Sequence, residues 1–342
     1  MISVEGSVRV DLLGGTLDIA PINLILKKAM TLNLATSLKA KVEILPLKFM
    51  ENGEDGIEIH SKDYHSIKFF RSHDFTQENI DQNFFGPLTF LVRILFHLKV
   101  SKGISIHLSS GSPPGAGLGG SSAMGVTFYK AVSAYLGQNI SEEKVIEIVG
   151  NIEAKSLDCG PTGYQDYYPA LYGGVLALIP QMDGIKVEQL FSRELAQILE
   201  GRLSLISSEE TRFSGLNNWE VIKRFFDKDP KIREGLEEIA HLSFKAYENL
   251  RLKKFNNLFD LIAKEGEVRE KLFPDIVTPS MRLLFNELKK ELPHLGMKVC
   301  GAGGGGCFLL IHNPEDKPFI QTKIQSETKM KVLPLKVLDP IQ

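Results

Sequence analysis

The sequence predicts a two-domain α+β protein, and two patterns along its 342 residues support that prediction. In the first half, short β-rich runs alternate with amphipathic stretches, which favours a mixed sheet with helices packed on it. From about residue 192 to 291 the pattern is mostly helical, and a strand, a glycine-rich loop and a second strand follow at 297–312. We therefore expect one domain over residues 1–190 and a second over residues 191–342.

Each expected element has a local reason in the sequence. In the stretch 122–136, Met124, Phe128 and Val132 recur at helical spacing, and Gly137 ends the pattern. Alternation with period two is typical of strands, and acidic residues in a first turn are typical of helix starts. In the first half we expect strands at 2–10, 33–47, 57–60, 66–70, 104–110, 173–180 and 184–190, and helices at 86–99, 122–136 and 141–154. In the second half, helices broken near Pro230 and between Pro274 and Pro279 precede a charged helix at 315–327 and a strand at 330–336.

The composition and charge of the chain exclude some classes of binding partner. Lys and Arg total 40 and Asp and Glu total 42, so no general positive field would hold a nucleic acid or an anionic membrane. The three cysteines and eight histidines form no zinc-binding pattern and no disulfide framework, which indicates a reducing compartment. The first residues lack the pattern of a signal peptide, and no apolar run is long enough to span a membrane. We expect a cytoplasmic protein with a small-molecule partner, acting as a monomer or a homodimer.

Glycine is concentrated at two places in the chain. Ten of the 30 glycines fall within residues 109–122 and 301–306. The first window lies between an expected strand and an expected helix, where a tight turn alone would need only one or two glycines. A loop that presents several backbone N–H groups to an anion at a helix N-terminus needs residues without a Cβ. The window therefore predicts a phosphate-binding loop.

Three motif families compete for this window. Gly115, Gly117 and Gly120 formally match G-x-G-x-x-G, but a dinucleotide fold needs a second parallel strand about 20 residues on, and a helix is expected there. The P-loop pattern nearly fits, yet Ser121 stands where its phosphate-binding Lys belongs. The third family is the GHMP kinases (galacto-, homoserine, mevalonate and phosphomevalonate kinases). PPGAGLGGSSA at 113–123 closely resembles their second motif, P-x-x-x-G-L-x-S-S-A, with one extra small residue before the serine pair.

Two further segments extend the resemblance over nearly the whole chain. VRVDLLGGTLD at 8–18 resembles the first motif of the sugar-kinase branch, and VCGAGGGGCFLLI at 299–311 is similar to the third motif. The two glycines before Thr16 are more like fucokinases and heptose 7-phosphate kinases than galactokinases. The resemblance implies the GHMP kinase fold, with an N-terminal mixed-sheet domain of ribosomal-protein-S5-like type, a C-terminal ferredoxin-like α+β domain, and an active site between them.

The resemblance also implies a set of roles for an ATP- and Mg²⁺-dependent transfer to a sugar hydroxyl. Asp166 would take or orient the hydroxyl proton, and Arg9 would offset the charge that develops on the phosphoryl group. Ser121 and Glu153 would serve Mg²⁺, since a hard cation prefers oxygen ligands. Thr16, Asp18, Gly303 and Gly304 would bind the acceptor. The ATP phosphates would lie on Pro114, Gly115, Ala116, Gly117, Leu118, Gly119, Gly120, Ser121 and Ser122.

Each assignment has a structural alternative. The serine pair would also suit a helix N-cap, Glu153 would suit a solvated helix face, and Asp166 would suit a helix N-cap or a surface ion pair. The segment 211–226 would either line the acceptor site or form a capped helix start with Trp219 packed. Cys300 and Cys307 are expected to be buried and inert.

Alternative functions also stay open at this point. Within the same fold, the acceptor would be a phosphorylated sugar such as a heptose 7-phosphate, or a non-sugar alcohol such as mevalonate or homoserine. A second class is a silent sensor that binds ATP and sugar, although such a protein has no need of the base that Asp166 would supply. A nicotinamide-dependent oxidoreductase is the third class.

Overall fold

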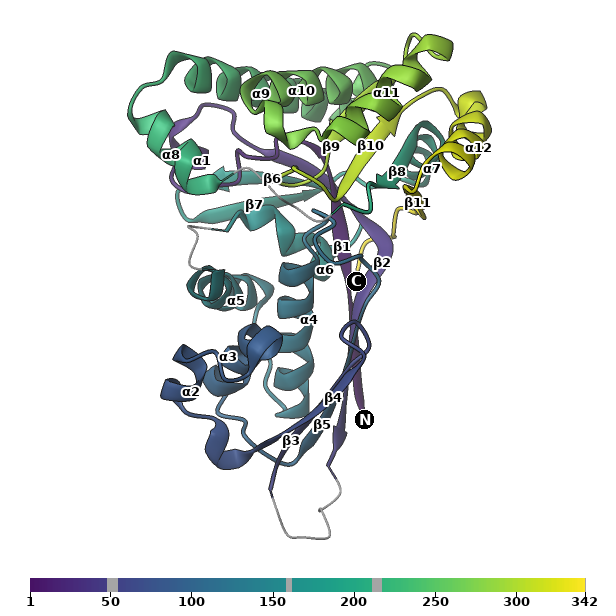
Figure 1. Ribbon diagram of the computed structural model, residues 1–342. Helices are drawn as coiled ribbons and strands as arrows, with labels where there is room; N and C mark the ends of the chain where they lie inside the picture. Colours follow the sequence, from purple (N-terminus) through teal and green to yellow (C-terminus); the bar gives the residue numbers. More distant parts are fainter. Residues whose placement is uncertain (48–54, 158–161, 211–216, 342) are drawn as a thin grey trace.

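Two long antiparallel strands, β1 (Ile2–Leu13) and β2 (Thr31–Pro46), run from one end of the computed structural model into its other half (Figure 1). The structure describes residues 1–47, 55–157, 162–210 and 217–341. The first residues of β1 alternate between partly buried and exposed, whereas residues 6–13 are all buried. Helices pack against β1 along this second part, so its polar side chains lie in the interior.

The sheet of the first half is mixed, as the sequence predicts. Within the described residues, seven strands form it in the order β4-β3-β5-β2-β6-β7, with β1 beside β2. The β3–β5 pair is parallel and the other pairs are antiparallel. The remaining strands are β3 (Gly56–Ser61), β4 (Ser66–Arg71), β5 (Ile104–Ser110), β6 (Val175–Gln181) and β7 (Gly184–Gln189).

Helix α4 (Gly120–Tyr135) lies along β1 and β2, and its position fixes the loop that precedes it (Figure 1). Of the predicted helix at 86–99, the first turn is a 3₁₀ turn at Gly86–Leu88 and the α-helix covers Thr89–His97. The other helices of this half are α1 (Ile22–Ile25), α2 (Gln77–Asp81), α3 (Thr89–His97), α5 (Glu142–Leu157) and α6 (Tyr168–Tyr172).

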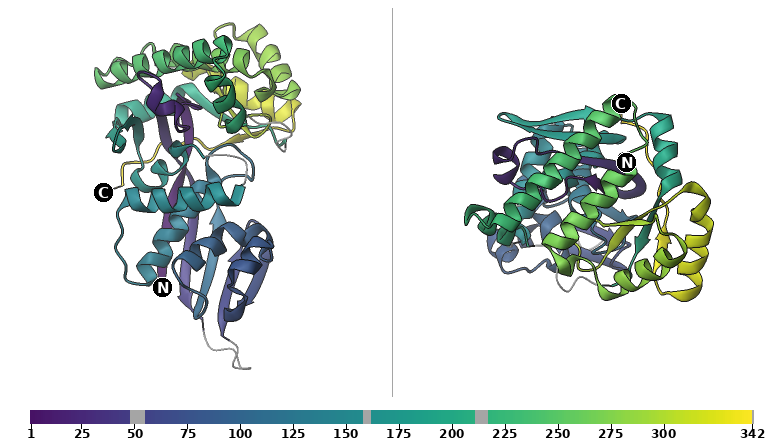
Figure 2. Two further views of the ribbon diagram at one scale, coloured as in Figure 1. Left: turned by 90° about the vertical axis from the view of Figure 1, so that its left-hand side faces the viewer. Right: turned by 90° about the horizontal axis from the view of Figure 1, so that it is seen from above.

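The second half has its own antiparallel sheet, in the order β11-β8-β10-β9 within the described residues. In the view from above (Figure 2), its long helices lie across the end of the molecule. The elements are α7 (Arg193–Arg202), β8 (Leu203–Ser207), α8 (Asn218–Phe226), α9 (Pro230–Arg251), α10 (Leu258–Leu272), α11 (Pro279–Glu291), β9 (Gly296–Val299), β10 (Cys307–Ile311), α12 (Lys317–Glu327) and β11 (Lys331–Leu333). Among the described helices, none has the length and apolar character that a membrane span requires.

Two sequence predictions for this half were incomplete. Strand β8 was missed inside the helical stretch, because all five of its residues are buried and a fully buried strand shows no alternation. The predicted strand at 330–336 is only three residues long. Beyond it the chain returns to the first sheet, where Val337 bridges Thr36 and Pro340 bridges Gly173. The proposed domain boundary at 190/191 lies between β7 and α7.

Candidate active site

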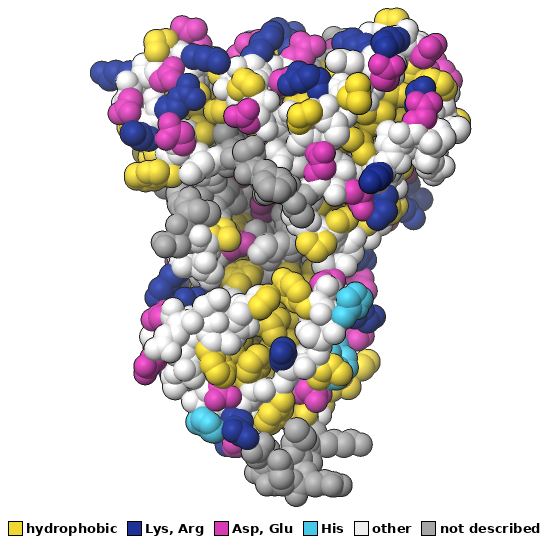
Figure 3. Space-filling view, in the orientation of Figure 1, with side chains coloured by type: hydrophobic (Ala, Val, Ile, Leu, Met, Phe, Trp, Pro, Cys, Tyr) yellow, Lys and Arg dark blue, Asp and Glu magenta, His cyan; other side chains and the backbone are white. Residues whose placement is uncertain are grey.

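A cavity of about 530 Å³ lies where β1, the first glycine-rich loop and the second glycine-rich loop meet. In Figure 3 the surface is hollowed between the upper and lower lobes, and hydrophobic side chains gather on the lower lobe beneath the hollow. The first half contributes Arg9, Thr16, Asp18 and Asp166 to the cavity wall, and the second half contributes Arg269. The structure therefore brings together residues that are far apart in the chain.

The first glycine-rich loop leads directly into α4. Gly115, Gly117 and Gly119 have φ angles of 69°, 74° and 71°, in the left-handed region that favours glycine. Gly119 is the N-cap of α4, and a Cβ there would lie 3.1 Å from the Cβ of Asp166. Neither serine of the 121–122 pair is therefore the cap. The first N–H groups of this 16-residue helix face the loop, which suits an anion.

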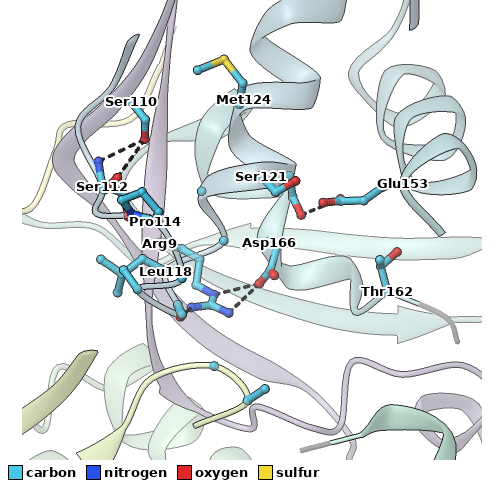
Figure 4. A pocket seen from close by; sticks show the side chains of 18 of the residues that line it. Arg9, Ser110, Ser112, Pro114, Leu118, Ser121, Met124, Glu153, Thr162 and Asp166 are labelled. Carbon is cyan, nitrogen blue, oxygen red and sulfur yellow. Dashed lines mark hydrogen bonds and ion pairs between the residues drawn. The ribbon is translucent and has the colours of Figure 1, made fainter. Parts of the chain in front are cut away.

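Arg9 and Asp166 form an ion pair at the cavity wall (Figure 4). Arg9 Nε donates to Asp166 Oδ1 over 2.9 Å, Nη2 lies 2.7 Å from the same oxygen, and Nη1 donates to the carbonyl of Gly117. Burial alone would lower the pKa of Arg9, but the carboxylates of Asp166 and then Asp11 raise it above its ordinary value. Asp166 is 28% exposed in its side chain while Arg9 is 3% exposed, so this is no surface pair. Asp166 also does not cap a helix, since it ends the 3₁₀ turn Tyr164–Asp166.

Asp18 is buried beside this pair and faces the same cavity. Burial, and next the negative charge of Asp166, raises the pKa of Asp18 to about 7. A Cβ on Gly163 would lie 1.9 Å from Asp18 Oδ2, so this close approach requires glycine at position 163. Thr16 has a φ of 84°, and its buried hydroxyl has no partner among the described residues. A ligand with hydroxyl groups would complete these contacts.

Glu153 is buried under the start of α4. Its Oε2 accepts hydrogen bonds from Ser122 Oγ at 2.7 Å and Tyr167 Oη at 2.8 Å. Burial raises the pKa of Glu153 above its ordinary value, even though the bonds from Ser121, Ser122 and Tyr167 oppose that shift. The structural alternative of a solvated glutamate is therefore wrong, since Glu153 is 3% exposed. The carboxylate and the Ser121 hydroxyl, both at the cavity wall, are oxygen ligands of the kind that Mg²⁺ prefers.

The second glycine-rich loop reaches the cavity through residues other than those predicted. Gly301 and Ala302 line the cavity. Gly303 and Gly304 instead pack on the turn at Ile276, where Gly304 N donates to the Ile276 carbonyl and a Cβ on Gly303 would lie 2.5 Å from that of Ile276. Their predicted contact with the acceptor is not seen at the cavity wall.

The described part of the segment 211–226 both caps a helix and lines the cavity. Residues 211–216, which include Arg212, lie outside the described residues, and so does Cys159. Asn217 caps α8, and Asn218 lines the cavity. Trp219 is 59% exposed, so its predicted packing is wrong. Cys300 and Cys307 are buried as predicted, and burial raises the pKa of the Cys300 thiol to about 12.

Sequence reasoning missed a buried group of charges next to Arg9. Asp11, two residues after Arg9 on β1, lies 3.3 Å from Lys298 Nζ and 3.7 Å from Arg269 Nη1. Lys298 also binds Glu265 on α10. Burial alone would raise the pKa of Asp11, but Lys298 and Arg269 hold it below its ordinary value. The sequence offered one indication of this group: Asp11 stands two residues after Arg9, so both side chains lie on the same face of a strand.

A further set of cavity residues from the first half was also missed. They come from the ends of β3 and β5, the segment before α3, and α3 itself: Ser61, Asp63, Tyr64, Pro87, Leu88, Phe90, Leu91, Leu108, Ser110 and Ser112. These residues give this part of the cavity wall a mixed polar and apolar character. Asp63 is held there by the backbone N–H of Ser110. No single motif marks these residues in the sequence.

Two family models match the chain. The model described as the GHMP kinases N terminal domain matches residues 88–174, and the GHMP kinases C terminal model matches residues 245–329. The first match covers the first glycine-rich loop, Glu153 and Asp166. The second covers Arg269 and the second glycine-rich loop.

Three curated proteins show what the chain is similar to. It is 25% identical over 329 residues to a bifunctional fucokinase/GDP-fucose pyrophosphorylase of Arabidopsis thaliana. The matched region covers 92% of this chain but only 30% of that protein. It is 25% identical to a mevalonate kinase of Saccharolobus solfataricus, over 69% of this chain and 70% of that protein. It is 27% identical to a D-glycero-alpha-D-manno-heptose 7-phosphate kinase of Campylobacter jejuni, over 62% of each.

Solved structures share the fold over almost the whole chain. The mevalonate kinase of Methanococcus jannaschii superposes with a TM-score of 0.75 at 20% identity and covers 98% of each chain. The Lactococcus lactis galactokinase complexed with galactose superposes with a TM-score of 0.72 at 9% identity, covering 98% of this chain and 93% of that chain. Enzymes with different acceptors thus share this architecture.

Proposed function

Because the chain belongs to the GHMP kinases, we propose that it transfers the γ-phosphoryl group of ATP to a hydroxyl group of a sugar, with Mg²⁺ as cofactor. The observation that carries the choice of a sugar is the position of Asp18. Its buried carboxylate lies beside the Arg9–Asp166 pair and faces the cavity. A carboxylate accepts more than one hydrogen bond at each oxygen, which suits an acceptor with several hydroxyl groups.

Two neighbouring polar atoms support a polyol acceptor. The Thr16 hydroxyl and the Gln165 Oε1 atom are buried and have no partner among the described residues, and both residues line the cavity. The hydroxyl can donate or accept a hydrogen bond and the amide oxygen accepts one, so both would complement hydroxyl groups of a sugar. Mevalonate carries a carboxylate, which would be repelled by the charges of Asp166 and of Asp18 in its ionised form.

The nucleotide would bind at the first glycine-rich loop. The loop N–H groups and the N-terminus of α4 would hold the ATP phosphates, with Ser121 and Ser122 at the start of the helix. Glu153 and Ser121 would hold Mg²⁺, which when bound neutralises negative charge on the phosphates. No group of three or more His, Cys, Asp and Glu residues in the described part of the chain could hold a metal alone. The nucleotide phosphates would therefore complete this site.

Asp166 would act as the base for the acceptor. As the hydroxyl oxygen of the sugar bonds to the γ-phosphorus and the bond to ADP breaks, the hydroxyl proton passes to the Asp166 carboxylate. Arg9 holds that carboxylate in place and offsets negative charge in the transition state. A silent sensor would need neither of these groups, which favours an enzyme.

A phosphorylated sugar is the second candidate acceptor. The similarity to a heptose 7-phosphate kinase favours it. The cations at the described cavity wall are Arg9 and Arg269, and both are paired with carboxylates. A free sugar is therefore the first candidate, and direct comparison of free and phosphorylated acceptors separates the two.

The assignment of Asp18 is tested by steady-state kinetics of Asp18→Ala with each substrate varied in turn. We expect the acceptor KM to rise at least about tenfold, or turnover to be lost, because each charge-assisted hydrogen bond contributes about 1.5–3 kcal/mol. The KM for ATP, measured in the same variant, should change less than about twofold. An effect confined to ATP would move Asp18 to the nucleotide site and remove the support for a sugar.

A further inference from the structure

Four contacts and the backbone of β1 join five residues into a ring at the first glycine-rich loop. Arg9 Nη1 donates to the carbonyl of Gly117. Gly301 packs so closely on Gly117 that a Cβ would lie 2.7 Å from the Gly117 carbonyl oxygen. Arg269 Nη2 donates to the Gly301 carbonyl over 2.7 Å, and Arg269 Nη1 lies 3.7 Å from Asp11 Oδ2. The backbone of β1 closes the ring, because Asp11 and Arg9 lie two residues apart on that strand.

The ring crosses from one half of the molecule to the other. Arg9, Asp11 and Gly117 belong to the first half, whereas Arg269 on α10 and Gly301 belong to the second. The contact between Gly117 and Gly301 depends on the absence of side chains, so it holds the two glycine-rich loops at one separation.

Arg269 has no role in the proposed chemistry, yet within this ring it makes two hydrogen bonds at the start of the second glycine-rich loop. It is 2% exposed, and its two terminal nitrogens donate to the carbonyls of Val299 and Gly301, where β9 ends and the second loop begins. A planar guanidinium can hold two carbonyls at a fixed angle, which an ammonium group cannot do. Asp11 compensates the buried positive charge.

We propose that Arg269 is a positioning residue for phosphoryl transfer. It fixes Gly301 against Gly117, and Gly117 in turn supports both the nucleotide loop and the guanidinium of Arg9. The inference rests on the proposed kinase function, because Gly117 is assigned there to the ATP phosphates. A displacement of about 1 Å at reacting groups can lower a rate about 10²-fold, so loss of this support is measurable.

The test is Arg269→Lys, which keeps a positive charge opposite Asp11 but cannot donate to the Val299 and Gly301 carbonyls in the same planar geometry. The matched control is Arg202→Lys. Arg202 Nε likewise donates to a backbone carbonyl, that of His312, at the end of β10 away from the loop. Each variant is compared with the parent by melting temperature, by MgADP affinity in calorimetry, and by kcat and both KM values.

We expect Arg269→Lys to lower kcat at least about tenfold and to weaken MgADP binding about tenfold, while the acceptor KM changes less than about twofold. Arg202→Lys should lower the melting temperature by a similar amount without these kinetic changes. A folded Arg269→Lys protein with the parent's kcat and MgADP affinity would overturn the proposal, as would equal kinetic losses in both variants.

A second variant covers the case in which Arg269→Lys does not fold. Gly301→Ala places a methyl group against the Gly117 carbonyl and should lower kcat at least about tenfold with the acceptor KM unchanged. Parent kinetics in this variant would overturn the proposal. If the parent protein binds no MgADP, the kinase function itself is overturned, and this inference with it. If the parent is active and Arg269→Lys has the same activity, only the role of Arg269 is overturned.

Discussion

The Nε and Nη2 atoms of Arg9 both bind Oδ1 of Asp166, 157 residues further along the chain. Among the described residues, Oδ2 of Asp166 receives no hydrogen bond, so it is the oxygen available to an acceptor. Arg9 is in turn fixed by the backbone, because its own N–H donates to the Leu118 carbonyl and its Nη1 to the Gly117 carbonyl. The pair thus joins the proposed base directly to the proposed nucleotide loop.

Substitution of the base separates chemistry from binding. Asp166→Asn keeps the shape of the side chain but removes its ability to take a proton, so kcat should fall about 10²-fold or more. MgADP affinity, measured by calorimetry, should change little. Asp81→Asn, which removes the carboxylate of the surface pair with Arg93, serves as the control and should leave kcat unchanged. Near-parent ADP release by Asp166→Asn would remove this residue from the mechanism.

The pKa of Asp18 predicts a pH dependence of acceptor use. With a pKa of about 7, Asp18 loses its charge as the pH falls through neutrality. The protonated carboxyl group accepts fewer and weaker hydrogen bonds from the hydroxyl groups of the acceptor. The kcat/KM for the acceptor should therefore fall about tenfold for each pH unit well below 7. Asp18→Asn should have a lower kcat/KM that lacks this dependence. The same slope in Asp18→Asn would show that another group titrates.

The same shift makes a prediction about stability. The folded protein holds the Asp18 proton more tightly than the unfolded chain, whose carboxyl has its ordinary pKa of 3.8. The folded state therefore binds more protons between about pH 4 and 7, and the free energy of unfolding decreases as the pH rises through this range. Denaturant melts at pH 5 and pH 7.5 should show a larger loss for the parent than for Asp18→Asn. Equal losses would contradict the assigned shift.

Removal of the buried carboxylate beneath α4 should raise the requirement for Mg²⁺. Glu153→Gln keeps the size of the side chain and a polar partner for Ser122 and Tyr167, so the fold should persist. The Mg²⁺ concentration for half-maximal activity should rise at least about tenfold, because Mg²⁺ prefers a carboxylate ligand. Tyr167→Phe, which removes one bond to Glu153 but keeps its charge, should have a smaller effect. An unchanged Mg²⁺ requirement in Glu153→Gln would place the ion elsewhere.

The nucleotide loop is tested by a side chain placed inside it. Gly117→Val combines an unfavourable left-handed backbone with a branched side chain where the phosphates would approach, so MgADP affinity should fall at least about tenfold. Gly137→Val provides the matched control. Gly137 has a similar φ of 69° with nothing within 4 Å of its Cβ position, at the end of α4 away from the cavity. Equal MgADP affinity in the two folded variants would mean that the phosphates lie elsewhere.

Local patterns and the family resemblance together predicted the first glycine-rich loop and the group formed by Arg9, Asp18 and Asp166. The glycines at 115–120 predicted a loop before a helix, and Arg9, Asp18 and Asp166 were expected together from the family resemblance. The structure places these three side chains at one cavity wall. The mixed sheet was predictable from periodicity, because residues 37–45 of β2 alternate between partly buried and buried, a period that differs from that of an amphipathic helix.

The remaining part of the site depends on long-range packing. Asp11 meets Lys298, which lies 287 residues away, and no local pattern encodes that contact. Lys298 and Glu265 are fully buried, and a charged residue is expected at the surface when only the sequence is considered. The second glycine-rich loop was assigned to substrate through Gly303 and Gly304, but the hydrogen bond of Gly304 to Ile276 turns that part of the loop away. The packing of Gly303 and Gly304 on η4 (Pro274–Ile276) is a tertiary contact that the local sequence does not encode.

The central claim, transfer of phosphate from ATP to a sugar, is tested most directly by an acceptor panel. ADP release would be measured with ATP, Mg²⁺ and, in separate reactions, free hexoses and deoxyhexoses, free heptoses, their phosphorylated forms, and mevalonate. We predict ADP release above the acceptor-free rate with at least one sugar, and loss of that release in Asp166→Asn. Release with mevalonate and with none of the free or phosphorylated sugars would contradict the assignment of Asp18 and Thr16 to a polyol acceptor.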